Sequence, residues 1–219
     1  MSQGPGPRIV LVIGSRNRKK CREMAELISP PWEVNPRLGR LEVRSVDEFE
    51  GVHEVEEDAE TFAGNARKKA SEVAVAVGQW TLADDSGLSV DELGGAPGVY
   101  SARYAGEPSD DDANNRKLLA AMDGASDENR AAAFHCALAL ADPSGAIRLE
   151  AEGICRGRLT REIRGPGGFG YDPLFLIREY HKTFGELSPL VKHQLSHRAR
   201  AFAQLRSGLE RMIAEGILH

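Results

Sequence analysis

The strand–loop–helix order at the start of the chain is the feature that most constrains its fold. Residues 8–13 (RIVLVI) form a short, continuous apolar run rich in β-branched side chains, which predicts a buried strand. Residues 14–17 (GSRN) interrupt that run. Apolar side chains at helical spacing then predict a helix over residues 19–28, which Pro30 and Pro31 end. The chain therefore begins with a strand, a polar loop and a helix.

The polar loop is a candidate anion site. The first backbone N–H groups of a helix have no partner within the helix and attract negative charge. Ser15, Asn17 and Lys20 add hydrogen-bond donors beside this helix start. The spacing of a Walker phosphate loop is absent. The alternative of a plain strand–helix connection with a solvated Lys20 therefore stays open.

A second helix is predicted over residues 59–77, directly after an acidic run at residues 54–58. Thr61, Asn65 and Lys69 are spaced four apart, so they are expected to line one polar face of this helix. That face is either exposed to solvent or the wall of a polar pocket.

A pair of carboxylates follows the next predicted strand. Residues 80–83 form that strand, and Asp84, Asp85 and Ser86 stand at its end, just before Gly87. Oxygen ligands of this kind suit Mg²⁺, which takes one or two carboxylates and leaves positions for water and phosphate oxygens. Asp, Ser and Gly are also ordinary turn formers, and on its own the motif favours a turn.

Further elements follow in the second half of the chain. Ser109 is expected to cap another helix, and the acids at residues 110–112 suit the positive end of that helix better than a metal site. Residues 131–141 and 147–159 are predicted to be strands, joined by a hairpin-like turn at residues 142–145.

Residues 165–173 (GPGGFGYDP) form an unusual glycine-rich loop. Its glycines fit the pattern GxGxxG, but a strand follows where a dinucleotide fold needs a helix, so that interpretation is discarded. Phe169, Tyr171 and Asp172 could instead clamp a planar ring between an aromatic face and polar groups.

A compact basic cluster lies near the predicted start of the last helix. Lys192, His197 and Arg198 belong to it. Cations at the start of a helix oppose its dipole, and such a local inconsistency is typical of functional sites. The alternative is a helix start that faces solvent.

Composition excludes several classes of protein. The formal net charge of -5 argues against a broad surface for DNA or RNA. Cys21, Cys136 and Cys155 lack metal or disulfide spacing, so they are expected to be reduced, buried thiols of a cytoplasmic protein. No apolar run approaches membrane-spanning length, and residues 1–7 do not form a signal peptide.

Five motifs in order carry a resemblance to a known family. They are SRNRKK, ETFAGNARKKA, LADDSGLSVDELGGAPGVYSARYAG, GGFGYDPLF and SHRARA. With these motifs the chain resembles the non-canonical purine nucleoside triphosphate pyrophosphatases, the inosine triphosphate pyrophosphatase family, over residues 10–205. The resemblance implies an elongated α/β fold, with a long mixed β-sheet flanked by helices and two lobes around a central nucleotide cleft. Residues 1–7 are expected to be a disordered tail, and residues 8–219 a single nucleotide pyrophosphatase domain.

The resemblance also implies an activity. The family hydrolyses dITP, ITP and XTP to the monophosphate and pyrophosphate, depends on Mg²⁺ and forms homodimers. It implies that Glu57 and Asp85 bind Mg²⁺ and that Asp85 is the general base, with Lys20 and Lys69 assisting catalysis. The implied substrate contacts are Ser15, Asn17, Lys20, Asn65, Ser86, Phe169, Gly170, Tyr171, Asp172, Lys192, His197 and Arg198.

The chain departs from the family pattern at two places. Arg16 stands where the family commonly has Gly, and Glu56 and Glu60 are neighbouring alternatives to Glu57. Two other functions remain as alternatives, namely a nucleotide pyrophosphatase of the septum-inhibitor type and a catalytically silent nucleotide-binding module.

Overall fold

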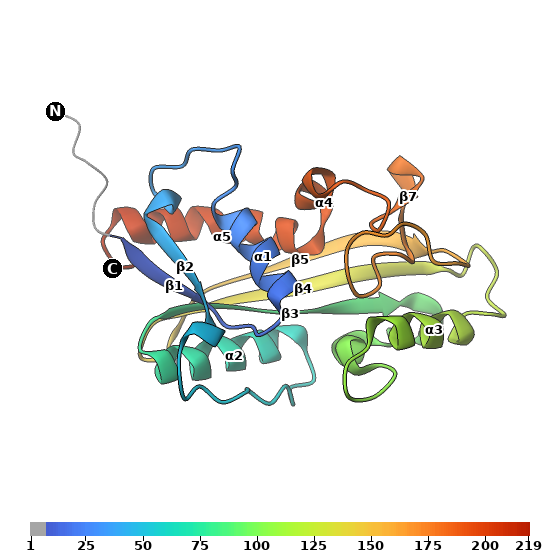
Figure 1. Cartoon of the computed structure of the whole chain (residues 1–219), viewed down its shortest axis with the longest axis horizontal. Coiled ribbons are helices and arrows are strands. Elements are labelled where there is room, and N and C mark those ends of the chain that lie inside the picture. The colour runs from blue at the N-terminus through green and yellow to red at the C-terminus, as the bar shows by residue number, and fades with distance from the viewer. Residues whose placement is uncertain (1–7) are drawn as a thin grey trace. The chain divides into compact units, whose positions relative to one another are not determined.

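The fold is built on a mixed seven-stranded β-sheet with helices beside it (Figure 1). The computed structural model describes residues 8–219, so the tail predicted at residues 1–7 lies outside the described residues. The strand order is β2-β1-β3-β4-β5-β6-β7. The strands are β1 (Ile9–Ile13), β2 (Leu41–Ser45), β3 (Trp80–Val90), β4 (Ala131–Ala141), β5 (Ile147–Leu159), β6 (Phe175–Ile177) and β7 (Lys182–Thr183). β1 pairs in parallel with β2 and β3, whereas β6 pairs antiparallel with β5 and β7, which confirms the predicted α/β class with a mixed sheet.

The described chain divides into two compact units. Unit 1 contains the described residues up to Asp85 together with Ala137–Glu152 and Ala201–His219, and unit 2 contains Ser86–Cys136 and Gly153–Arg200. The α-helices are α1 (Arg18–Ile28), α2 (Phe62–Val77), α3 (Asp111–Ala121), α4 (Pro189–Leu195) and α5 (His197–Ala214). None of the helices within residues 8–219 is long and apolar enough to cross a membrane.

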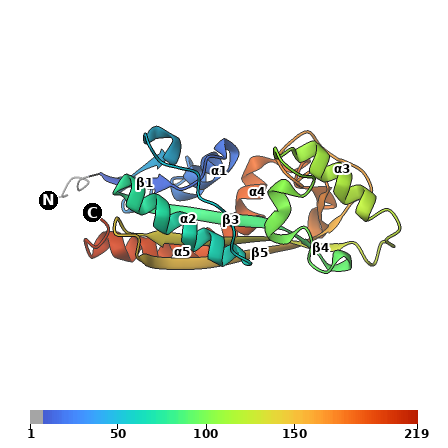
Figure 2. The same cartoon turned by 90° about the horizontal axis from the view of Figure 1, so that it is seen from below.

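Unit 1 packs helices on both faces of its strands. Figures 1 and 2 show α2 on one face and α1, with the unit 1 part of α5, on the other. Where α2 packs on β3 and β4, the buried cluster consists of alanines, which lets the helix approach these strands closely: Ala66, Ala70, Ala74, Ala83, Ala137, Ala139 and Ala141. Toward β1, Val73 of α2 packs with Val12 and Val46. Because side chains alternate between the faces of a strand, β3 can serve both layers of this unit.

Unit 2 has an aromatic core of its own. Phe134 of β4 lies 4.5 Å from Phe175 of β6, measured between ring centroids, and Phe175 stacks on Phe184 at 5.5 Å. Leu118 and Met122 from the α3 region are fully buried in the same cluster. This core supports α3 and the glycine-rich loop that precedes β6.

Several sequence predictions hold in detail. β4 and β5 have the predicted bounds, and the turn between them is present. Among the described residues no cysteine is in a disulfide; Cys136 and Cys155 are buried as expected, whereas Cys21 is half-buried.

Other predictions about local structure were wrong. Asp84, Asp85 and Ser86 do not form a turn at the end of a strand, because β3 continues through them to Val90. Their buried carboxylates are matched by cations and an amide from neighbouring helices, described below. Within β5, Gly153 and Cys155 take buried positions, and Ile154 between them is 39% exposed.

Two helix starts also differ from the prediction. α2 begins at Phe62 rather than at residue 59, and Thr61 is its N-cap, with its hydroxyl accepting the N–H of Gly64 at 3.1 Å. Thr61 is therefore a cap and not part of the polar face. The cap of α3 is Asp110 and not Ser109, whose hydroxyl instead donates to the Ala102 carbonyl.

Candidate functional site

The topology of unit 1 creates a candidate binding position at the end of β1. The β1–β3 register ends at the pair Ile13 and Leu82, after which the chain leaves the sheet at Gly14 while β3 continues. α1 follows β1 on one face of the sheet, and α2 precedes β3 on the other (Figure 1). Such a reversal between parallel strands, at their carboxyl ends, is where open α/β sheets bind ligands.

The loop at the start of α1 is ordered by its own side chains. Asn17 is the N-cap, and its Oδ1 accepts the backbone N–H groups of Lys19 at 3.0 Å and Lys20 at 3.1 Å. The expectation that these N–H groups are open to an anion was therefore wrong, because a good capping residue already accepts them. Ser15 Oγ accepts the N–H of Asn17 at 3.2 Å. The Asn17 cap therefore uses two of the N–H groups at the start of α1.

Arg16, the departure from the family pattern, is directed to a neighbouring segment. Its guanidinium pairs with Asp47 Oδ1 at 2.8 Å and also donates to the Val52 carbonyl. The extra cation therefore ties the loop to the segment that follows β2 and does not displace Ser15 or Asn17 from their mutual contact.

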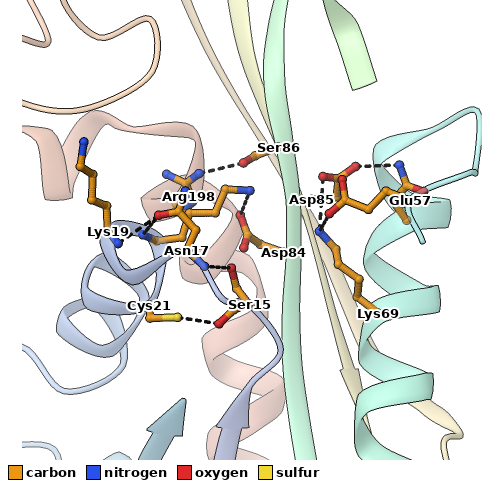
Figure 3. A network of polar contacts seen from close by, with 12 residues as sticks. Ser15, Asn17, Lys19, Cys21, Glu57, Lys69, Asp84, Asp85, Ser86 and Arg198 are labelled. Atoms are coloured by element: carbon orange, nitrogen blue, oxygen red, sulfur yellow. Dashed lines mark hydrogen bonds and ion pairs between the residues drawn. The ribbon is translucent and has the colours of Figure 1, made fainter. Parts of the chain in front are cut away.

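Successive acids of β3 point to opposite faces of the strand (Figure 3). Asp84 is directed to the α1 face, where Lys20 Nζ lies 3.5 Å from its Oδ2. Asp85 is directed to the α2 face, where Lys69 Nζ lies 3.5 Å from its Oδ1. The two lysines therefore approach β3 from opposite sides, just beyond the end of β1.

Asp85 is the centre of the contacts on the α2 face. It is 3% exposed, and the Asn65 amide donates to its Oδ2 at 3.0 Å. Lys69 Nζ also contacts Glu57 Oε1 at 2.7 Å, so one ammonium group joins two carboxylates. Asn65 additionally accepts the N–H of Ala59 at 2.9 Å, which holds the segment after Glu57 against α2. The structure thus brings together the four residues predicted to act at this point.

The charges of this cluster shift the pKa values of its members. Burial raises the pKa of Asp85, and Glu57 raises it further against the opposing effect of Lys69. Burial lowers the pKa of Lys69, but Asp85, Asp84 and Glu57 outweigh burial, and the net shift is upward. Lys69 therefore pairs with Glu57 and Asp85 on one face of β3, and Lys20 pairs with Asp84 on the other.

In unit 2, the glycine-rich loop is closed around Asp172. Its Oδ2 accepts the N–H of Phe169 at 2.8 Å and pairs with Lys192 Nζ at 2.7 Å. A Cβ on Gly168 would lie 2.2 Å from the same oxygen, so glycine is required there for the loop to fold over Asp172. Lys192 also lies over the half-buried Phe169 ring, 4.6 Å from its centroid.

The other two residues of the predicted basic cluster, Arg198 and His197, have different surroundings. Arg198 lies over the Phe169 ring at 5.3 Å and donates to Ser86 Oγ at 2.7 Å (Figure 3). His197 is instead buried, with its ring stacked 4.8 Å from Phe134. Lys192, Arg198 and Phe169 thus form a cationic and aromatic group, while His197 packs into the core beneath.

A model of the Ham1 family matches residues 11–208, nearly the whole chain. The chain belongs to the Ham1 family. This confirms the resemblance carried by the five motifs.

Individual Ham1 relatives are similar over almost their full length. A protein named dITP/XTP pyrophosphatase from Desulforamulus reducens is 50% identical over 202 residues, covering 92% of this chain and 96% of its own. One of the same name from Rhodopirellula baltica is 50% identical over 203 residues, covering 93% and 94%. The solved structure of a HAM1 protein from Coxiella burnetii has a TM-score of 0.80 at 38% identity and covers 93% of this chain and 99% of its own.

The sequence analysis did not identify two residues that contact the Ham1 glycine-rich loop, and it did not show that a third, Tyr171, is buried. Asp111 and Asn115 of α3 hydrogen-bond to Gly170, but the acids here were taken only as helix caps. Their spacing of four residues was the available signal. Phe169 and Tyr171 were both candidates to stack on a ring, but Tyr171 is 4% exposed and its hydroxyl donates to the Ser101 carbonyl at 2.8 Å. Phe169 is therefore the accessible aromatic residue of this loop.

Proposed function

We propose that this protein hydrolyses dITP, ITP and XTP to the nucleoside monophosphate and pyrophosphate. The observation that carries the proposal is the Glu57–Lys69–Asp85 group, which lies beyond the end of β1 at a ligand-binding position of the sheet. The names of the relatives, at 50% identity over more than nine-tenths of the chain, support the same reaction. Such an enzyme removes deaminated purines from the nucleotide pool.

We propose Mg²⁺ as the cofactor, held by Glu57 and Asp85. Both carboxylates reach one cation, the Lys69 ammonium, so they lie close enough to share a metal ion. Within residues 8–219 no group of three or more His, Cys, Asp or Glu side chains could hold a metal alone. Mg²⁺ is commonly bound by one or two carboxylates together with substrate phosphates. When bound, Mg²⁺ would neutralise phosphate oxygens and make the α-phosphorus more electrophilic.

Asp85 is proposed to act as the general base. A water molecule attacks the α-phosphorus, its proton passes to Asp85, and the bond from the α-phosphorus to the bridging oxygen breaks. The electron pair leaves with pyrophosphate. Asn65 fixes one oxygen of Asp85 at 3.0 Å, which orients the other oxygen toward Lys69. Asp84, paired with Lys20 on the opposite face, is proposed to have a supporting role.

Lys20 and Lys69 are proposed to offset charge that develops on the leaving pyrophosphate. They approach β3 from opposite faces, so phosphate groups lying beyond the end of β1 would have a cation on each side. Ser15 and Asn17 supply the neutral contacts of the same loop. Positioned charges of this kind are the main catalytic device in phosphoryl transfer.

Base selection is proposed to depend on the loop of unit 2. The Phe169 ring would stack on the purine, and Lys192 and Arg198 beside it would donate hydrogen bonds to a 6-keto group. Adenine has a donor at that position, so it would leave these buried groups unpaired, which discriminates strongly. His197 and Asp172 would support these residues from below.

The quaternary and cellular setting is part of the same proposal. The resemblance supports a cytoplasmic homodimer, and the net charge of -5 supports free nucleotides rather than DNA or RNA as the substrate.

A substrate panel tests the proposal. Purified protein with Mg²⁺ is incubated with dITP, ITP, XTP, dATP, dGTP and pyrimidine nucleotides, and pyrophosphate and orthophosphate are measured separately. We expect pyrophosphate from the first three at far higher rates than from dATP or dGTP. Equal rates on all purines would contradict the specificity, a preference for pyrimidines would favour the septum-inhibitor class, and release of orthophosphate alone would contradict the reaction.

A further inference from the structure

Two side chains near the start of α3 form hydrogen bonds with one residue of the glycine-rich loop. Asp111 Oδ2 accepts the N–H of Gly170 at 2.9 Å, and the Asn115 amide donates to the Gly170 carbonyl at 2.8 Å. The same amide donates to the Asp111 carbonyl at 2.8 Å, which couples the two contacts. Asp111 and Asn115 are one helical turn apart and therefore lie on one side of α3. The helix holds Gly170 through both its N–H and its carbonyl.

Helix capping does not account for these two residues. Asp110 already caps α3, since its Oδ1 accepts the N–H groups of Asp112 at 2.9 Å and Ala113 at 3.1 Å. Asn115 is only 2% exposed, although asparagine is a poor residue for a helix interior. A buried amide needs hydrogen-bond partners, and one of the partners of Asn115 is the loop. Its position in the helix is thus explained by Gly170.

These hydrogen bonds matter because Gly170 has little conformational preference of its own. Gly170 has a φ angle of 58° and directly follows Phe169, and a Cβ built on Gly170 would meet no atom within 4 Å. Glycine at a positive φ has little intrinsic preference for one conformation, so ordering it costs entropy. On the far side of Gly170, the hydroxyl of the buried Tyr171 is fixed on Ser101. Gly170 is therefore fixed by α3 on one side and by the core of unit 2 on the other.

We propose that Asp111 and Asn115 are positioning residues that hold Phe169 in place for base binding. This inference rests on the proposed function, in which the Phe169 ring stacks on the purine. A loop already ordered in the free protein loses less entropy when the ligand binds. Removing the hold therefore weakens substrate binding, while the chemical step at Asp85, in unit 1, keeps its rate.

Kinetics of Asp111→Ala and Asn115→Ala test the inference. The Asp111 contact is exposed, so that variant is expected to fold normally and to raise the KM for dITP about five-fold, the effect of one hydrogen bond, with kcat changed less than about two-fold. Asn115→Ala is expected to raise KM by about ten-fold or more, because a buried amide is lost. Asp111→Asn keeps an oxygen acceptor for the Gly170 N–H and is expected to restore most of the wild-type KM.

Asp112→Ala is the matched control. Asp112 is an exposed acid in the same first turn, so its removal deletes the same favourable charge at the helix N-terminus without touching the loop. Its KM and kcat are expected to equal those of the wild type. An equal rise in KM for Asp112→Ala and Asp111→Ala would overturn the inference, as would a loss confined to kcat.

A second measurement separates this inference from the proposed function. Hydrogen exchange of the Gly170 amide, followed by NMR in the absence of nucleotide, is expected to accelerate several-fold in Asp111→Ala and not in Asp112→Ala. Exchange that is unchanged in Asp111→Ala would overturn the inference, whether or not the protein hydrolyses dITP. Accelerated exchange in Asp111→Ala, together with a wild-type protein that releases no pyrophosphate from dITP, would support the role of Asp111 in holding the loop and contradict the proposed function alone.

Discussion

The substitution Asp85→Asn is expected to lower turnover strongly while changing the free energy of unfolding little. It keeps the shape of the side chain and removes one negative charge. In the wild type, the Asn65 amide donates to Asp85 Oδ2 at 3.0 Å. After the substitution, the remaining oxygen of the new amide can still accept this hydrogen bond. The proposed general base is lost, and loss of a positioned base lowers turnover by about 10²–10⁴-fold.

The effect of Asp85→Asn on stability can be estimated from the same geometry. At 3.5 Å the attraction between Asp85 and Lys69 is about 5 kcal/mol with an effective dielectric constant of 20. The desolvation of a buried carboxylate is of similar size and opposite sign. Lys69 also keeps Glu57 at 2.7 Å after the substitution. The free energy of unfolding is therefore expected to change by no more than about 1 kcal/mol.

Asp84→Asn is the matched control for this prediction. Asp84 is 1% exposed, and its Oδ2 also lies 3.5 Å from a lysine, Lys20, on the opposite face of β3. Pyrophosphate release from dITP and thermal unfolding are measured for both variants. Asp84→Asn is expected to keep far more activity than Asp85→Asn at similar stability. Equal losses of turnover in the two variants, or an active Asp85→Asn, would refute the assignment of the base.

Two further predictions concern stability. Tyr171→Phe removes the hydrogen bond to the Ser101 carbonyl and is expected to cost about 1 kcal/mol in chemical denaturation; a larger effect on dITP binding than on stability would contradict the buried role of Tyr171. Hydrogen bonds from Ser144 and Arg148 lower the pKa of Asp142 to about 2, so this group contributes stability above its unfolded pKa of about 4 that is lost as pH falls toward 2. Asp142→Ala is expected to lower stability by about 1–2 kcal/mol at pH 7, with a smaller difference from wild type at pH 2, and a difference that does not shrink in acid would refute the linkage.

How far the sequence predicts the fold depends on the kind of signal. The bounds of β4 follow from its continuous run of apolar residues, and those of β5 from its alternating side chains. A turn with Asp, Pro, Ser and Gly separates the two strands. β3 was cut short because Asp84 and Asp85 are poor strand residues on their own. Only tertiary partners make them acceptable there: Lys20 on one face, and Lys69 with Asn65 on the other.

The candidate site shows the same division between local and tertiary information. The motifs named Lys69 and Asp85 in advance, since the residue types and their order are specific. Glu57 lies outside the five motifs and came from the resemblance, with Glu56 and Glu60 as alternatives. The motifs could not tell which aromatic residue of the glycine-rich loop is accessible, because Phe169 and Tyr171 differ only in the packing around them. Nor could local sequence separate Asp110, which caps α3, from Asp111, which binds Gly170 across 59 residues of sequence.

The most direct test of the proposed reaction is the position of an oxygen atom from solvent. Hydrolysis of dITP is run with Mg²⁺ in water enriched in oxygen-18, and the products are analysed by mass spectrometry. Attack on the α-phosphorus, next to the Asp85 base, predicts one labelled oxygen in dIMP and none in pyrophosphate. Label in pyrophosphate, or labelled orthophosphate as the first product, would contradict the proposed reaction.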